Sequence, residues 1–161
     1  MSERMITALV IAVTIGSGMM AGVFLAFSSF IMAALGRLPP SAGMAAMQNI
    51  NVTVINPLFM TGLFGTALLC FVLDIIIWRN GTIQQGSLLY LASALYIGGA
   101  ILVTMGFNVP LNDALAGVSS DSETGTNLWS RYLVDWTFWN SVRGLASCAA
   151  CAVFALALSS P

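Results

Sequence analysis

The sequence contains no histidine and no lysine, and only 7% of its 161 residues are charged. Without histidine, this chain alone offers no His-ligated haem, copper, zinc or non-haem iron site and no His-based catalytic triad. Five arginines and six acidic residues give a formal net charge of −1. Because there is no basic surplus, nucleic acid is not expected as a partner.

Cysteine is also scarce, and all three cysteines lie in apolar runs. Cys148 and Cys151 have the two-residue spacing of a redox or metal-binding pair. Their neighbours are alanine and serine, however, which favours small packing residues on a membrane helix. No metal site and no cofactor are therefore expected.

Apolar residues are abundant: they make up 58% of the chain, and the mean hydropathy is +0.93. This composition indicates a single integral membrane domain over residues 1–161. Apolar segments predict membrane spans at about residues 5–35, 53–78, 86–107 and 134–158. The first segment could be a signal peptide, but its hydrophobicity continues well past the roughly 7–15 apolar residues of a signal sequence. We therefore interpret it as an uncleaved span.

These segments predict an all-α fold, a four-helix up-and-down transmembrane bundle. A short amphipathic helix is expected before span two, at residues 44–51, and Pro110 is expected to end the third helix. The last helix should begin at about Asp121, so that its N-terminal part extends beyond span four.

Arginine positions give little information about orientation, because Arg4 and Arg79 share one side and Arg37 and Arg131 share the other. The N-terminal amine favours both termini in the cytoplasm. The lack of an Arg-rich and Ser-rich leader favours a bacterial inner membrane over an organelle membrane.

Gly18 and Gly22 are four residues apart and predict a close helix contact. The helix surface formed by these two glycines could join two copies in a homo-oligomer, or it could face lipid.

The most polar stretch within the apolar regions is residues 129–143. At helical spacing, one face carries Trp129, Tyr132, Trp136, Asn140 and Arg143. Arg131 and Asp135 are four residues apart and could pair with each other. Arg143 needs a partner from another part of the fold.

An up-and-down bundle brings other polar residues to the same membrane face as this helix face. They could form an interhelical clamp with an interfacial aromatic belt. Alternatively, they could line a pocket whose small amphipathic ligand presents a phenolate, enolate or carboxylate to Arg143. The candidate residues are Gln48, Asn49, Asn51, Asn108, Asn112, Trp129, Tyr132, Trp136, Asn140 and Arg143.

Several of these segments together resemble the membrane family known as domain of unknown function 1772, or the anthrone oxygenase family. The resemblance covers roughly residues 5–158 and is clearest at residues 21–30, 38–40, 46–51, 56–59, 108–113 and 129–143. It implies a multi-pass membrane protein. Some fungal relatives are associated with oxidising anthrones to anthraquinones without an established metal or flavin.

The resemblance implies a hydrophobic aromatic or quinone-like ligand and a possible cofactor-free oxygenase. Arg143 with Asn108, Asn112 or Asn140 would stabilise an enolate oxygen. The remaining candidates, Gln48, Asn49, Asn51, Trp129, Tyr132 and Trp136, would contact the substrate. Asp113, Asp135, Tyr132 and water are the candidates for the base. The alternatives are a non-catalytic lipid-binding or assembly protein and, third, a transporter.

Overall fold

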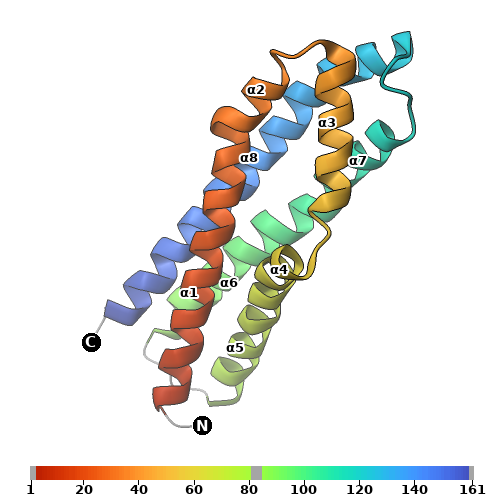
Figure 1. Ribbon diagram of the computed structural model, residues 1–161. Coiled ribbons are helices and arrows are strands. Elements are labelled where there is room, and N and C mark those ends of the chain that lie inside the picture. The colour runs from red at the N-terminus through yellow and green to blue at the C-terminus, as the bar shows by residue number, and fades with distance from the viewer. Residues whose placement is uncertain (1–2, 81–84, 160–161) are drawn as a thin grey trace.

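The computed structural model describes residues 3–80 and 85–159, and all regular structure within these ranges is helical. Four long helical stacks form the bundle (Figure 1), and each is apolar and long enough to cross a membrane. They cover Glu3–Leu35, Pro57–Arg79, Gly86–Ala116 and Glu123–Ser159. The predicted all-α transmembrane bundle is confirmed, and the chain is a multi-pass membrane protein in a lipid bilayer.

Three of the stacks contain short π-helical segments between their α-helices. The first stack is α1 (Glu3–Ala26), η1 (Phe27–Ile31) and α2 (Met32–Leu35). The second is α4 (Pro57–Met60), η2 (Thr61–Gly65) and α5 (Thr66–Asn80). The third is α6 (Gly86–Tyr96), η3 (Ile97–Leu102), η4 (Thr104–Asn108) and α7 (Val109–Ala116). The fourth is the single helix α8 (Glu123–Ser159).

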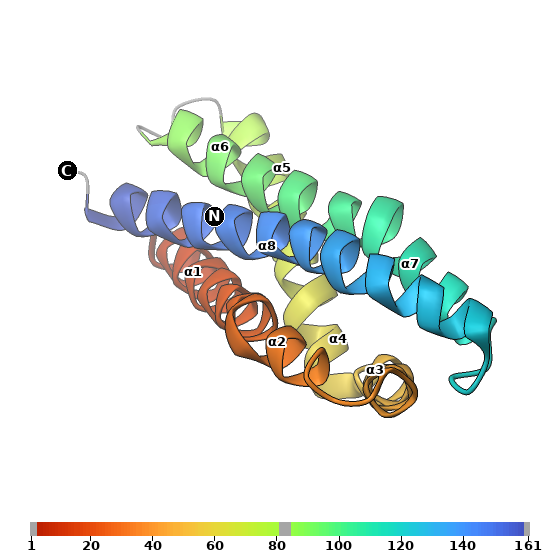
Figure 2. The same ribbon diagram turned by 90° about the horizontal axis from the view of Figure 1, so that it is seen from above.

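The stacks run alternately up and down. The N-terminal end of α1 and the C-terminal end of α8 therefore lie at the same end of the bundle (Figure 1). Seen from above, α8 lies between α1 on one side and α5 with α6 on the other (Figure 2). The amphipathic helix predicted before span two is α3 (Pro40–Thr53), which packs against α7 and α8. The extended N-terminal part of the last helix is also confirmed, since α8 begins at Glu123.

The third helix does not end where the sequence predicted. Pro110 lies in the first turn of α7, and the chain remains helical to Ala116. A proline in a helix interior removes one backbone hydrogen bond and crowds the preceding turn. Here the π-helical turn of η4 ends at Asn108, so the regular hydrogen-bond ladder is already interrupted before the proline ring. The prediction that Pro110 ends this helix was therefore wrong.

Two smaller predictions also differ from the structure. Arg131 and Asp135 are both exposed, and no ion pair joins them in the described part of the chain. Exposed pairs of this kind gain little from pairing, and the Arg-before-Asp order is the weaker one on a helix. Gly18 packs within the chain, where a Cβ would lie 3.2 Å from Cys151 Sγ, whereas Gly22 has open space around it. The two glycines do not act as one ridge inside the bundle.

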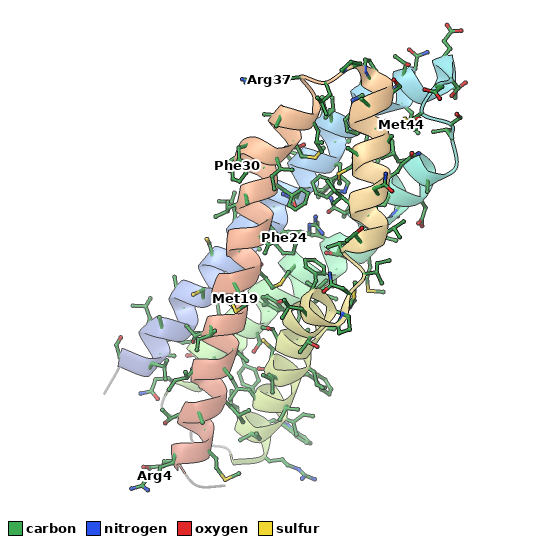
Figure 3. All side chains as sticks on the ribbon, viewed as in Figure 1. Arg4, Met19, Phe24, Phe30, Arg37 and Met44 are labelled. Carbon is green, nitrogen blue, oxygen red and sulfur yellow. The ribbon has the colours of Figure 1, made fainter. Side chains whose placement is uncertain are left out.

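Arg4 and Arg37 mark opposite ends of the first stack (Figure 3). Between them, the interior divides into two apolar clusters. The lower cluster joins α1, α5, α6 and α8, with Phe24, Tyr96 and Phe154 among its largest residues. The upper cluster joins α2, α3, α7 and α8 around Met44 and Trp129. The polar site lies at the boundary between these clusters.

Neighbouring glycines in η3 provide a matched test of helix packing. A Cβ on Gly99 would collide with the side chain of Ala146 on α8, whereas a Cβ on Gly98 would meet nothing within 4 Å. We predict that Gly99→Val lowers the free energy of unfolding by about 1–3 kcal/mol through overpacking, and that Gly98→Val has little effect. Thermal unfolding in detergent measures both variants. Equal stability of the two variants would contradict the close packing of η3 against α8 at Gly99 and Ala146.

Candidate functional site

One face of α8 supplies the site, and it is the face predicted from helical spacing. Trp129, Tyr132, Trp136, Asn140 and Arg143 are all buried, with exposed fractions of 6% or less. Because α8 lies at the centre of the bundle, this face meets α1, α3 and the third stack at once. A stripe of polar and aromatic side chains is thus placed inside an apolar protein.

Arg143 is buried among neutral partners. Its Nη1 donates to Thr104 Oγ1 at 3.1 Å, and its Nη2 donates to Asn140 Oδ1 at 2.7 Å. The guanidinium carbon lies 4.4 Å from the ring centre of Phe24 and 5.3 Å from that of Trp136, distances typical of cation–π contacts. No carboxylate pairs with Arg143 anywhere in residues 3–80 and 85–159, and its Nε has no hydrogen-bond partner.

Asn140 joins this arginine to the first stack. Its amide nitrogen donates to the backbone oxygen of Phe24 at 2.6 Å and to Ser28 Oγ at 2.7 Å. Ser141 Oγ also contacts Ser28 Oγ, at 2.9 Å. Since the Asn140 oxygen accepts from Arg143, the amide is orientated by bonds on both sides. Asn140 therefore holds the guanidinium in a fixed position.

A second amide, Asn112, organises the aromatic side chains. Its Oδ1 accepts from the Tyr132 hydroxyl and from Trp136 Nε1, both at 2.8 Å. The Asn51 amide nitrogen approaches the same Tyr132 hydroxyl at 3.4 Å. The Asn112 amide nitrogen has no partner among the described residues, so it is free to donate to a ligand. This arrangement leaves a hydrogen-bond donor opposite Arg143.

A cavity of about 180 Å³ lies between these two polar groups. Its polar lining comes from Asn51, Thr104, Asn112, Asn140 and Arg143, and the rest is apolar. The volume is below the roughly 300–1,000 Å³ of typical ligand pockets, which favours a small ligand. The apolar and aromatic lining residues are Val23, Phe24, Phe27, Met47, Ile50, Val54, Ile55, Phe59, Met60, Leu63, Phe64, Val109 and Trp136.

Not every predicted site residue reaches this cavity. Gln48 donates to the backbone oxygens of Leu115 and Val118, at 2.8 and 3.1 Å, and so ties α3 to the end of α7. Asn49 is exposed and bonds to the backbone of its own helix. These two amides are therefore not placed at the cavity, because only one side of α3 faces the bundle.

Three further candidates lie behind the cavity wall. Trp129 packs against Gly43 and stacks on Tyr132, with ring centres 5.7 Å apart. Tyr132 in turn stacks on Trp136, so these rings support the wall from behind. Asn108 is 1% exposed and donates to the backbone oxygen of Trp136 at 3.2 Å. Asn108 thus lies next to the site without lining the cavity.

No obvious proton acceptor lines the cavity, since its lining contains no acidic, histidine or cysteine side chain. Two of the candidate bases, Asp113 and Asp135, are exposed. The third, Tyr132, uses its hydroxyl as a donor to Asn112.

In the described ranges there is also no cluster of three or more Cys, Asp or Glu side chains that could hold a metal ion. The site as built can bind and stabilise an anion.

Sequence reasoning missed two important residues of the site, Thr104 and Phe24. Both lie within long apolar segments, where neither stands out as a polar or charged residue would. The π-helical turns also could not be predicted from composition, although η1, η2 and η4 each contribute lining residues such as Phe27, Leu63 and Thr104. Such turns occur frequently at functional sites in helical proteins.

The fold and site define a small multi-pass membrane protein with a cavity whose lining includes the buried Arg143. A model of the anthrone oxygenase family matches residues 44–153. The chain therefore belongs to this family, as the sequence resemblance predicted. Comparisons with curated proteins and with solved structures find no match.

The contribution of the Asn112 hydrogen bonds to stability can be measured by comparison with the exposed amide Asn49. Replacing Asn112 with Ala leaves the Tyr132 hydroxyl and the Trp136 indole N–H without their acceptor. We predict a loss of about 1–3 kcal/mol in the free energy of unfolding. Asn49→Ala is the control, because this exposed amide bonds only to its own helix backbone. Thermal unfolding measures both variants, and an Asn112→Ala variant as stable as Asn49→Ala would contradict the described hydrogen-bond network.

Proposed function

We propose that the cavity binds a small hydrophobic aromatic molecule whose ionised oxygen contacts Arg143. The observation that carries this proposal is the buried guanidinium, which has only neutral partners in the described part of the chain. Two of its five N–H groups are used in hydrogen bonds, so others remain for a ligand oxygen. A phenolate or enolate would supply the missing negative charge, and the apolar walls would enclose its rings.

The route into the cavity also favours a lipid-soluble ligand. Four of the lining residues are exposed apolar side chains, with exposed fractions between 37% and 70%. They come from α1, the α3–α4 connection, η2 and α7, and an opening with such a rim would lead to lipid rather than water. These residues are Val23, Ile55, Phe64 and Val109.

With an anthrone as ligand, this site would support oxygenation by dioxygen. Loss of one proton from the ring methylene gives an enolate, whose oxygen Arg143 and the Asn112 amide nitrogen would stabilise. The enolate reacts at the former methylene carbon with dioxygen. One oxygen atom becomes the new carbonyl, and the other leaves as water, which contains the remaining methylene hydrogen and one proton taken up from the protein or solvent in place of the one first removed. The overall conversion is balanced without an additional reductant.

A second candidate function is lipid binding or assembly without catalysis. The observation that favours it is the network through Asn140, which already connects α1, the third stack and α8. Under this alternative, Arg143 and Asn140 clamp the helices. The open surface around Gly22 would be available to a second copy, and the homo-oligomer remains a prediction.

The proposal also includes a cellular location. We expect a bacterial inner membrane with both termini in the cytoplasm. Arg4 and Arg37 lie at opposite ends of the first stack (Figure 3), so the N-terminal amine supplies the preference for this orientation.

Oxygen consumption with anthrone tests the enzymatic proposal. We predict that the reconstituted wild type accelerates oxygen uptake and that Arg143→Gln lowers the rate about 100-fold, because the enolate loses its charged donor. Arg131→Gln is the control, since Arg131 is an exposed arginine on the same helix. No acceleration by the wild type, or equal rates in the two variants, would count against catalysis and would favour the structural clamp.

A further inference from the structure

A second group of polar side chains lies in the lower half of the bundle, away from the cavity. On α5, Thr66, Cys70 and Asp74 are spaced four residues apart and share one helix face. Cys70 is fully buried, Thr66 is 5% exposed, and Asp74 is half-buried. No cationic side chain pairs with Asp74 in the part of the chain that the structure describes. An unpaired acid within a membrane helix is a candidate for a functional role.

The helix opposite carries a matching set of hydroxyls. Ser93 lies beside both Cys70 and Asp74. One turn further along, the Tyr96 hydroxyl donates to the backbone oxygen of Leu63 at 3.1 Å. The same stack then reaches Thr104, the hydroxyl that accepts a hydrogen bond from Arg143. The third stack therefore connects the level of Asp74 with the level of the cavity.

Several polar atoms between these two levels are buried without a hydrogen-bond partner. They include the hydroxyl oxygens of Ser17, Ser93 and Ser147 and one carboxylate oxygen of Asp74. All three serines are fully buried. Ser147 lies one turn below Arg143 on α8, and Ser17 follows Gly16, which packs against Thr66. Buried polar groups without protein partners commonly bind internal water.

The spacing of these groups suits water bridges. Groups one helical turn apart, such as Thr66, Cys70 and Asp74 on α5, are about 5.4 Å apart along the axis, close to the length of two hydrogen bonds through one water molecule. Residues 97–103 of the third stack carry no hydroxyl, so the column also needs the buried hydroxyls of Ser17 on α1 and Ser147 on α8. From Thr104 to Ser93, eleven residues along the stack span about 16 Å. We define the polar column as the set that covers this distance: Ser17, Thr66, Cys70, Asp74, Ser93, Tyr96, Thr104 and Ser147.

We infer that the polar column carries protons between the cavity and Asp74, which acts as the terminal proton acceptor. This inference rests on the proposed function, because it supplies the base that the cavity lining lacks. The C–H bond of the ligand methylene breaks, and its electron pair remains on the ligand as the enolate. The proton moves along hydroxyls and bridging water, and one proton binds the Asp74 carboxylate. No electrons are transferred in this step.

The position of Asp74 allows the proton to leave the protein. The exposed side chains of Trp78 and Arg79 follow it by about one turn, at the end of α5. The Tyr90 hydroxyl contacts the backbone oxygen of Asp74 at 3.3 Å, in an exposed region. Asp74 is therefore the member of the polar column nearest to the exposed end of α5.

Hydrogen–deuterium exchange of anthrone in the absence of oxygen tests the column. The full chain is reconstituted in nanodiscs in deuterated buffer, and exchange at the anthrone methylene is followed by mass spectrometry. Asp74→Asn should lower the protein-dependent exchange rate about 10-fold to 100-fold. Anthrone binding, measured by quenching of tryptophan fluorescence, should stay unchanged. Asp74→Glu should restore most of the exchange, which a purely structural role would not predict.

Two comparisons separate the possible failures. Asp121→Asn is the control, since this exposed acid is remote from the column. The proposed proton path would be overturned if Asp74→Asn bound anthrone and exchanged its methylene protons as fast as the wild type. It would also be overturned if Asp74→Glu lost as much exchange as Asp74→Asn. Absence of anthrone binding by the wild type would instead overturn the proposed function on which the inference rests.

Discussion

The buried Arg143 guanidinium is the constraint on which the rest of the site depends. A charged side chain within the membrane costs a few kcal/mol unless the protein provides partners. Here a hydroxyl from the third stack, an amide from α8 and an aromatic ring from α1 provide them. Asn140 is itself bonded to the first stack, so the position of the arginine and the packing of three helical stacks are determined together.

Helical periodicity in a uniformly apolar chain was sufficient to predict both the bundle and the buried face of α8. The same reasoning selected Asn51, Asn112 and Asn140, which line the cavity, but it could not distinguish Asn51 from Asn49 two residues earlier. That distinction depends on which side of α3 faces α8. Phe24 and Thr104 were missed because an apolar or weakly polar residue in a membrane span gives no local signal. Thr104 also lies in the π-helical turn η4, which composition could not predict.

The side chains of the interior differ along its length. The upper half places the hydrogen-bond donors of Arg143 and Asn112 among aromatic and aliphatic side chains. The lower half contains an acid without an ionic partner and several buried hydroxyls without hydrogen-bond partners. Under the proposed function, substrate arrives from lipid, charge develops beside Arg143, and the proton leaves towards the other membrane face. Family membership agrees with a lipid-soluble substrate, but the geometry of Arg143 carries the argument.

The most direct test of the central claim, that the cavity holds an aromatic anion at Arg143, is to identify what travels with the protein. Gently solubilised wild type, Arg143→Gln and Arg131→Gln can be compared by native mass spectrometry and organic extraction. We predict a small aromatic molecule bound to the wild type and to Arg131→Gln and absent from Arg143→Gln. Bulk lipid alone, in equal amounts in all three, would contradict this account.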